Sequence, residues 1–299
     1  MCIRDRKEKV KSKGVLKGLS HIALPCTLSS AARSLLNTSE NLLIPKELQK
    51  FGLNYSASLS QYGLLQGMAM PMLYFPSSFL TSFASLLIPK IAKERELHHG
   101  KAVAHITGKA VSYAIAFGLF FSAVFVVFGQ SWGNAFYHSE SAGEYLRVLA
   151  PIVPLIYLDV VVDSLLKGLD EQFNSMKYNF SDSLIRVLLV LCLLRFFGME
   201  SYICILFFST IFNAALSLHR LLKVTKVRLS LLKNVLLPLL CAVLSVAITN
   251  FLLSGFSLQN AFLQLALQTI FSGAIFTFGF FTVCQPESCL LYTSDAADD

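Results

Sequence analysis

The sequence predicts an all-α membrane protein that folds as a polytopic bundle of helices. Three observations support this class: long apolar stretches separated by short loops, a composition too hydrophobic for an ordinary soluble domain, and basic residues concentrated in the loops. Of the 299 residues, 55% are hydrophobic and only 14% are charged, and the mean hydropathy is +0.61. Only helices or closed barrels satisfy every backbone N–H and C=O group in hydrocarbon, and about 20 helical residues cross a bilayer core about 30 Å thick.

The apolar stretches predict about eight transmembrane helices. They cover residues 16–38, 61–88, 106–128, 146–168, 178–197, 201–222, 231–253 and 261–284. Residues 1–6 (MCIRDR) and 288–299 (SCLLYTSDAADD) resemble translated sequencing-adapter read-through, so we expect them to be foreign to the protein and its reading frame to be cut at both ends. The bundle is therefore assigned to residues 7–284, and residues 285–299 are assigned to a tail outside it.

Lysine and arginine cluster in alternate loops. They are dense before the first stretch, between the second and third stretches, and between the sixth and seventh: residues 4–17, 90–109 and 220–233. Loops rich in these residues stay in the cytoplasm, so an even number of spans places both ends of the chain there. Loop orientation then explains the net charge of +7, and we expect no nucleic-acid partner.

The sequence contains no catalytic or metal-binding motif. Most of the seven cysteines fall inside apolar stretches, and no pair has C-x-x-C spacing. The P-loop, the zinc-protease motif H-E-x-x-H and the nucleophile elbow G-x-S-x-G are all absent. We therefore expect neither an enzyme nor a bound cofactor or metal.

The first apolar stretch carries polar residues at helical spacing. Ser29, Arg33, Asn37 and Glu40 recur at intervals of four, four and three, which places them on one face of a helix. An ionisable side chain at membrane depth costs about 2.5–3.5 kcal/mol and normally faces a bundle interior or a wet cavity. The stripe therefore predicts a water-filled cavity; the alternative is that Arg33 and Glu40 reach the outer membrane interface.

Two later stretches carry ionisable residues one helical turn apart. Asp159, Asp163 and Lys167 share a face in the fourth stretch, and two neighbouring carboxylates can hold a proton or a cation. The alternative is a simple ion pair between Asp163 and Lys167 near the cytoplasmic end. Asp182 and Arg186 in the fifth stretch have the same spacing, which predicts an ion pair that stabilises the helix; contact with a ligand is the alternative.

Four segments carry a resemblance to a known family. In chain order they are residues 40–50 (ENLLIPKELQK), 61–71 (QYGLLQGMAMP), 75–90 (FPSSFLTSFASLLIPK) and 168–187 (GLDEQFNSMKYNFSDSLIRV). Over residues 7–282 the chain resembles the second half of the stage V sporulation protein B and polysaccharide-biosynthesis flippase branch of the multidrug/oligosaccharidyl-lipid/polysaccharide exporter superfamily. The resemblance implies a transporter of two lobes around a central cavity, in which the missing N-terminal lobe is a partner of this chain.

The resemblance also implies a function, a location and a binding site. Members of this branch move lipid-linked sugar precursors of cell walls or surface polysaccharides across the bacterial cytoplasmic membrane. In this chain, Arg33 would bind the phosphate oxygens of such a substrate. The other polar residues expected at the site are Asn37, Glu40, Gln61 and Gln66, while the lipid tail stays among the membrane lipids.

Two other functions remain open from the sequence. A cation-coupled multidrug antiporter of the same superfamily would use Asp159 and Asp163 as its coupling carboxylates. A membrane scaffold for polysaccharide or spore-coat assembly would not translocate a substrate, and it would tolerate neutralisation of Arg33, Glu40 and Asp163 together.

Overall fold

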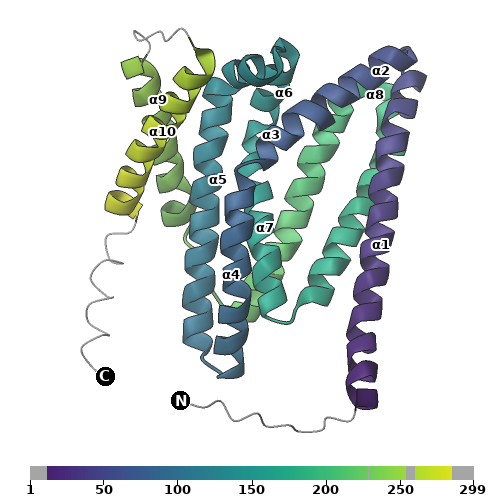
Figure 1. Ribbon diagram of the computed structural model, residues 1–299, viewed down its shortest axis with the longest axis vertical. Coiled ribbons are helices and arrows are strands. Elements are labelled where there is room, and N and C mark those ends of the chain that lie inside the picture. Colours follow the sequence, from purple (N-terminus) through teal and green to yellow (C-terminus); the bar gives the residue numbers. More distant parts are fainter. Residues whose placement is uncertain (1–11, 228, 254–259, 285–299) are drawn as a thin grey trace.

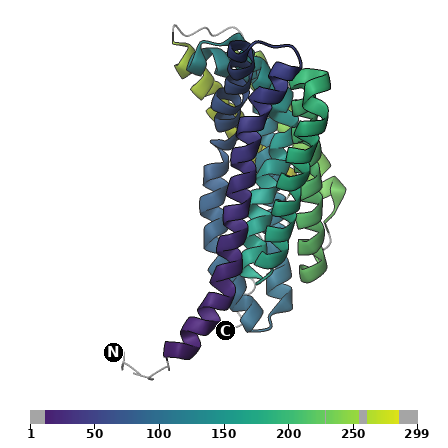
Figure 2. The same ribbon diagram turned by 90° about the vertical axis from the view of Figure 1, so that its right-hand side faces the viewer.

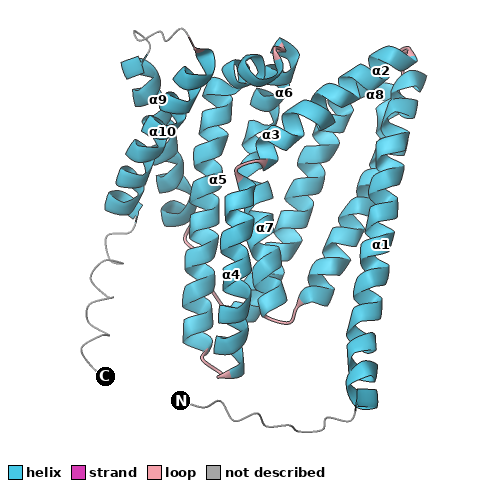
Figure 3. Ribbon diagram, in the orientation of Figure 1, coloured by secondary structure: helices cyan, strands magenta, loops and turns pink. Residues whose placement is uncertain are grey.

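A computed structural model describes residues 12–227, 229–253 and 260–284 of the chain. Within these residues every regular element is a helix and there is no strand (Figure 3). The predicted all-α class is therefore confirmed.

The helices run mostly lengthwise and side by side (Figure 1). In chain order they are α1 (Ser12–Lys50), α2 (Tyr55–Gly63), η1 (Leu64–Ala69), α3 (Met70–Tyr74), α4 (Ser77–Glu96), α5 (Gly100–Tyr137), α6 (Glu140–Leu149), η2 (Ala150–Ile152), α7 (Val153–Gly168), α8 (Gln172–Thr225), η3 (Leu232–Leu236), α9 (Leu237–Leu253), α10 (Ala261–Gly279) and η4 (Phe280–Cys284). Helices α4, α5 and α7 form the middle of the bundle. Helices α1 and α8 lie together on one side of it, and α9 and α10 lie on the other (Figures 1 and 2).

The described helices form a multi-pass membrane protein. Five helical stretches are long and apolar enough to cross a membrane, and there are six spans if the bent pair of residues 55–74 and 77–96 counts as one. Helix α8 has 54 residues and covers two of the predicted spans, whereas α1, with 39 residues around the first predicted span, is not among the five. The predicted class therefore holds, but the count of eight is loose.

Large apolar side chains cover much of the outer surface of the bundle. Phe251, Phe278 and Leu86 are 80%, 75% and 73% exposed. An apolar surface on this scale is unfavourable in water. Surrounded by lipid chains it costs little, which agrees with the membrane assignment.

Helix α8 is a hairpin rather than one straight rod. At Gly198 the backbone is non-helical, with φ 64° and ψ −149°. Asn213 donates to Asn179 over 3.3 Å, and Ser209 donates to Asp182, so residues far apart along α8 lie side by side. The chain therefore reverses at Gly198 and brings two polar helix faces together.

Replacing Gly198 with Ala is expected to destabilise the hairpin by about 1–3 kcal/mol, because this region of φ and ψ is essentially restricted to glycine. A Cβ atom at this position would also lie 2.8 Å from Cε1 of Phe51. The free energy of unfolding in detergent micelles measures the effect. Gly67→Ala is the matched control, since nothing lies within 4 Å of an added Cβ there, and an equal loss of stability in both variants would contradict the prediction.

Helices α2 to α4 form a bent helical segment. Its two parts meet at 51°, with Pro71 in the first turn of α3 and Pro76 at the N-terminus of α4. Proline lacks the N–H that would continue the helical hydrogen bonds, so it permits such a break. The hydroxyl of Tyr157 donates to the carbonyl oxygen of Leu73 over 2.8 Å, which ties the bend to α7.

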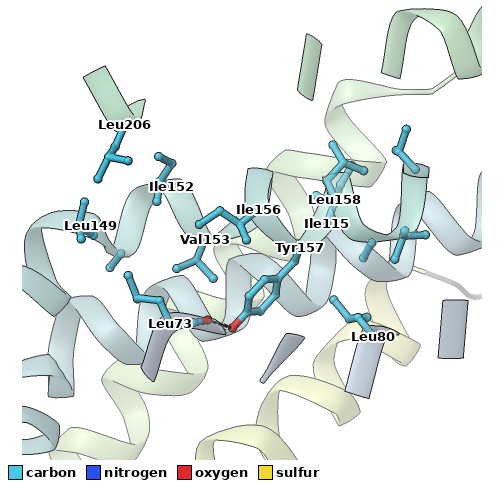
Figure 4. Packing of buried hydrophobic residues seen from close by; sticks show 14 of the residues in the cluster. Leu73, Leu80, Ile115, Leu149, Ile152, Val153, Ile156, Tyr157, Leu158 and Leu206 are labelled. Carbon is cyan, nitrogen blue, oxygen red and sulfur yellow. Dashed lines mark hydrogen bonds between the residues drawn. The ribbon is translucent and has the colours of Figure 1, made fainter. Parts of the chain in front are cut away.

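The main hydrophobic core surrounds Tyr157, whose side chain is fully buried among aliphatic residues of α3, α4, α5 and α7 (Figure 4). A second, smaller core joins α5 to α9 and α10. There the rings of Phe120 and Phe276 stack with centroids 5.0 Å apart. The main core packs α7 against α5. Polar residues of α7 and α8 lie on the side toward α1, where they line cavities together with Arg33.

An ion pair closes the open end of the α8 hairpin. Arg220 donates from Nη2 to both carboxylate oxygens of Glu171, over 2.8 and 2.9 Å, and Asn174 donates to the same carboxylate over 2.5 Å. Partial burial raises the pKa of Glu171, but the hydrogen bonds from Arg220 and Asn174 outweigh it, so the net shift is downward from 4.5.

This ion pair is expected to make stability sensitive to acid. A carboxyl group whose pKa is lower in the folded state stabilises the fold above its unfolded pKa, and that contribution is lost as the pH falls through its folded pKa. Glu171→Gln should therefore lower the melting temperature at neutral pH and leave it unchanged in strong acid. Thermal unfolding of both proteins across the acid range tests this; a constant difference at every pH would contradict it.

Candidate functional site

A polar cleft lies between α1, α7 and α8. It consists of two cavities of about 270 Å³ each, which share Arg33 and Asp163 in their linings. The first cavity is also lined by further charged and polar side chains: Tyr74, Asp159, Asp182, Arg186, Thr210 and Asn213. The second is lined by Ser30, Lys167, Gln172, Ser175 and Asn179. A cleft with this many charges among apolar helices is the structure's main candidate for a functional site.

Arg186 is the centre of a buried cluster of charges. Its guanidinium donates to Asp182 over 2.5 Å and to Ser209 over 3.1 Å, and it lies 4.0 Å from Glu40. Tyr202 donates to the Glu40 carboxylate over 3.3 Å. Glu40 and Asp182 are only 5% and 4% exposed, so water solvates neither carboxylate well and both depend on protein partners. The predicted ion pair between Asp182 and Arg186 is present. Arg186 also lines the first cavity.

The cluster explains why α1 packs against α8. Of the polar residues predicted to share one face of α1, Arg33 and Asn37 are exposed and Glu40 is buried. Its carboxylate contacts a charged and a hydroxyl group of α8, those of Arg186 and Tyr202. Arg186 thus connects α1 to both halves of the α8 hairpin.

Asp163 and Asp159 accept hydrogen bonds from neutral side chains of α8. Ser175 donates to Asp163 over 2.6 Å and Asn179 donates to it over 3.2 Å, while Asn213 donates to Asp159 over 3.0 Å. Within the described part of the chain, Asp163 makes no ion pair within 4 Å, so the direct pair with a lysine one turn away is not formed. The carboxylates instead face the cleft.

Two buried oxygen atoms of residues that line the first cavity have no hydrogen-bond donor within the part of the chain that the structure describes. They are Oδ1 of Asp159 and Oδ1 of Asn213. Buried polar atoms in folded proteins are nearly always paired. Two unpaired acceptors on a pair of hydrogen-bonded side chains therefore indicate a place where a proton donor or a cation fits.

The structure separates the predicted substrate-binding residues. Arg33 lines both cavities and is exposed, and within the described residues its guanidinium forms no ion pair or hydrogen bond. Asn37 and Gln66 are also exposed, Gln61 is half-buried, and none of the three lines either cavity. The side chain of Ser29 lies outside the described residues. Only Arg33 of the set is available to a ligand in the cleft.

Sequence reasoning missed the neutral residues that hold the cleft together. Asn179 and Asn213 connect the two halves of the hairpin and bind the carboxylates of α7, while Ser209 and Tyr202 complete the buried cluster. A signal was present, since residues 175, 179, 182 and 186 are all polar and recur at helical spacing within an otherwise apolar stretch.

The fold and the cleft define a multi-pass helical membrane protein with a charged interior cleft. Comparison with known proteins adds two relatives from Bacillus subtilis (strain 168). The chain is 25% identical to stage V sporulation protein B over 175 residues, which is 58% of this chain and 34% of that protein. It is 26% identical to sporulation protein YkvU over 142 residues, 48% of this chain and 32% of that protein.

These relatives confirm the predicted resemblance to stage V sporulation protein B. The chain spans about a third of the length of the relatives it matches. No family model matches the chain, and no solved structure matches it.

Proposed function

We propose that the chain is one lobe of a membrane flippase that moves lipid-linked sugar precursors across a bacterial cytoplasmic membrane, with both of its ends in the cytoplasm. One observation carries the proposal: a cleft lined by Arg33, Asp159 and Asp163 lies among apolar helices. The similarity to two sporulation proteins supports a role in sporulation.

The difficult step for such a carrier is moving a phosphate and a sugar through hydrocarbon. A fixed guanidinium substitutes for lost water by donating to phosphate oxygens. Arg33 is suited to this role, because it is shared by the two cavities and has no ion-pair partner within the described residues. Arg186 is not, since Asp182 and Glu40 already occupy it.

The partner of this chain is then a second lobe that completes the cleft. Arg33 and Asn37 are exposed on α1, and exposure of a charged residue to lipid is unfavourable. A facing lobe would cover this surface and enclose the substrate. Rocking of one lobe against the other would then expose the cleft to each side in turn.

Transport of a fluorescent undecaprenyl-linked sugar in proteoliposomes tests the proposal. The chain is reconstituted together with the N-terminal lobe that the resemblance implies, and a membrane-impermeant quencher reports the substrate that reaches the other leaflet. Substrate that is protected from the quencher in empty liposomes should become quenched when the protein moves it to the other leaflet. Equal quenching in empty liposomes and in proteoliposomes would reject the proposal, and would leave a scaffolding role as the better account.

A second function, cation-coupled antiport, is favoured by the unpaired oxygens of Asp159 and Asn213. These acceptors would bind the coupling ion or proton, and the substrate would be a cationic drug. Dye efflux driven by a proton or sodium gradient, and abolished by Asp159→Asn, would favour the antiporter. Transport of the lipid-linked sugar without dye efflux would favour the flippase.

A further inference from the structure

A second polar pocket lies on the other side of the bundle from the cleft, where the C-terminal ends of α5 and α9 meet the N-terminal end of α10. Its volume is about 630 Å³. This end of the bundle lies opposite the basic loop that joins α4 to α5 (Figure 1). The positive-inside rule therefore predicts that the pocket opens on the outer face of the membrane.

Carboxamide side chains dominate the polar lining of this pocket. They are those of Asn134, Asn250, Asn260, Gln264 and Gln268, and the other polar residues of the lining are Ser131 and His138. Gln268 is only 8% exposed, yet its side chain makes no hydrogen bond to any described residue. Its amide atoms are not enclosed by the protein, so they are open to the pocket. An amide that lines a pocket without a protein partner can donate and accept hydrogen bonds with a ligand there.

The chemistry of the lining identifies the class of ligand. It contains no Asp, Glu, Lys or Arg, so a phosphate or an ammonium group would be buried without a counter-charge. A carboxamide both donates and accepts hydrogen bonds, as does a sugar hydroxyl. Phe128 and Phe262 also line the pocket and offer apolar surface to the C–H face of a sugar ring.

We infer that this pocket binds an uncharged carbohydrate group, through the carboxamides of α5, α9 and α10. The group is either the sugar of a membrane glycolipid or a soluble saccharide from outside the cell. The inference does not depend on translocation through the cleft, because the two sites share no residue.

The single tryptophan of the chain provides a local reporter. Trp132 stacks on Phe136 with ring centroids 5.1 Å apart, and Phe136 lies 5.1 Å from Phe262 of the pocket. The chain is placed in phosphatidylcholine nanodiscs and titrated with glucosyl diacylglycerol, with plain diacylglycerol, and with free maltose. A saturable change in Trp132 emission with glucosyl diacylglycerol, absent with diacylglycerol, is expected.

Two variants separate binding from folding. Gln268→Leu should weaken glucosyl diacylglycerol binding about tenfold, the effect of losing about one good hydrogen bond, and Asn134→Leu should act in the same direction from α5. Gln130→Leu is the matched control, because that carboxamide donates to the Glu140 carbonyl instead of lining the pocket.

The titrations with glucosyl diacylglycerol and with maltose distinguish the source of the sugar. Saturation by maltose with the affinity of the glycolipid supports the pocket as a site for soluble saccharide, and saturation by the glycolipid alone supports a membrane headgroup. No saturable change with either sugar, or unchanged affinity in Gln268→Leu and Asn134→Leu, would overturn the inference.

Discussion

Replacing Arg186 with Met is expected to destabilise the protein by about 3–5 kcal/mol, because it would leave two buried carboxylates without their cation. Asp182 and Glu40 are both at least 95% buried and both face this guanidinium. The free energy of unfolding, from titration with denaturing detergent in mixed micelles, measures the loss. Loosening of α1 should accompany it, since Glu40 is the residue of α1 that the cluster holds.

Two controls distinguish this explanation from a general effect of losing an arginine. Arg95 pairs with Asp170 over 3.6 Å, but both side chains are at least half exposed, so Arg95→Met should cost less than about 1 kcal/mol. The triple variant Glu40→Gln, Asp182→Asn and Arg186→Met removes all three charges together. It should recover most of the stability, because the cost arises from unpaired charge; a triple variant as unstable as Arg186→Met would contradict this account.

The class of fold was predictable because only helices and closed barrels satisfy the backbone hydrogen-bonding groups within the hydrocarbon of a membrane. Apolar length alone was sufficient for α5, α9 and α10, whose predicted spans coincide with helices in the structure. The reversal at Gly198 was also implied by the loop between two predicted spans. The number of spans was harder to predict, because α1 is too polar and α2 to α4 too bent for a hydropathy criterion to count them without ambiguity.

Spacing predicted which residues share a helix face, but it could not predict which faces meet. Asp182 and Arg186 pair because one turn separates them on one helix. The contacts of Arg186 with Glu40 and Ser209 depend on how α1 and the second half of α8 pack. Gln61 and Gln66 were grouped with Arg33 by polarity alone, and Asn37 by its spacing on α1; none of the three lines either cavity.

Replacing Arg33 with Ala is expected to lower the rate of lipid-linked sugar transport by about tenfold to a hundredfold. A hydrogen bond to a charged group contributes about 1.5–3 kcal/mol, and each 1.4 kcal/mol corresponds to a factor of ten. The guanidinium lines both cavities and forms no ion pair within the described residues. Loss of the guanidinium should therefore slow substrate transport and leave the stability of the fold unchanged.

Growth of a flippase-deficient strain measures this effect in cells. The protein, expressed with its N-terminal lobe, should support growth, and the Arg33→Ala variant should fail to do so at the same level in the membrane. Arg33→Lys should be intermediate, because an ammonium keeps the charge but loses the two-pronged contact with phosphate. Arg95→Ala is the control and should grow normally, because Arg95 lies in the last turn of α4 with a half-exposed side chain and lines neither cavity. Normal growth of Arg33→Ala would exclude this arginine from substrate binding, and the proposed transport of a phosphate group would then lose its main support.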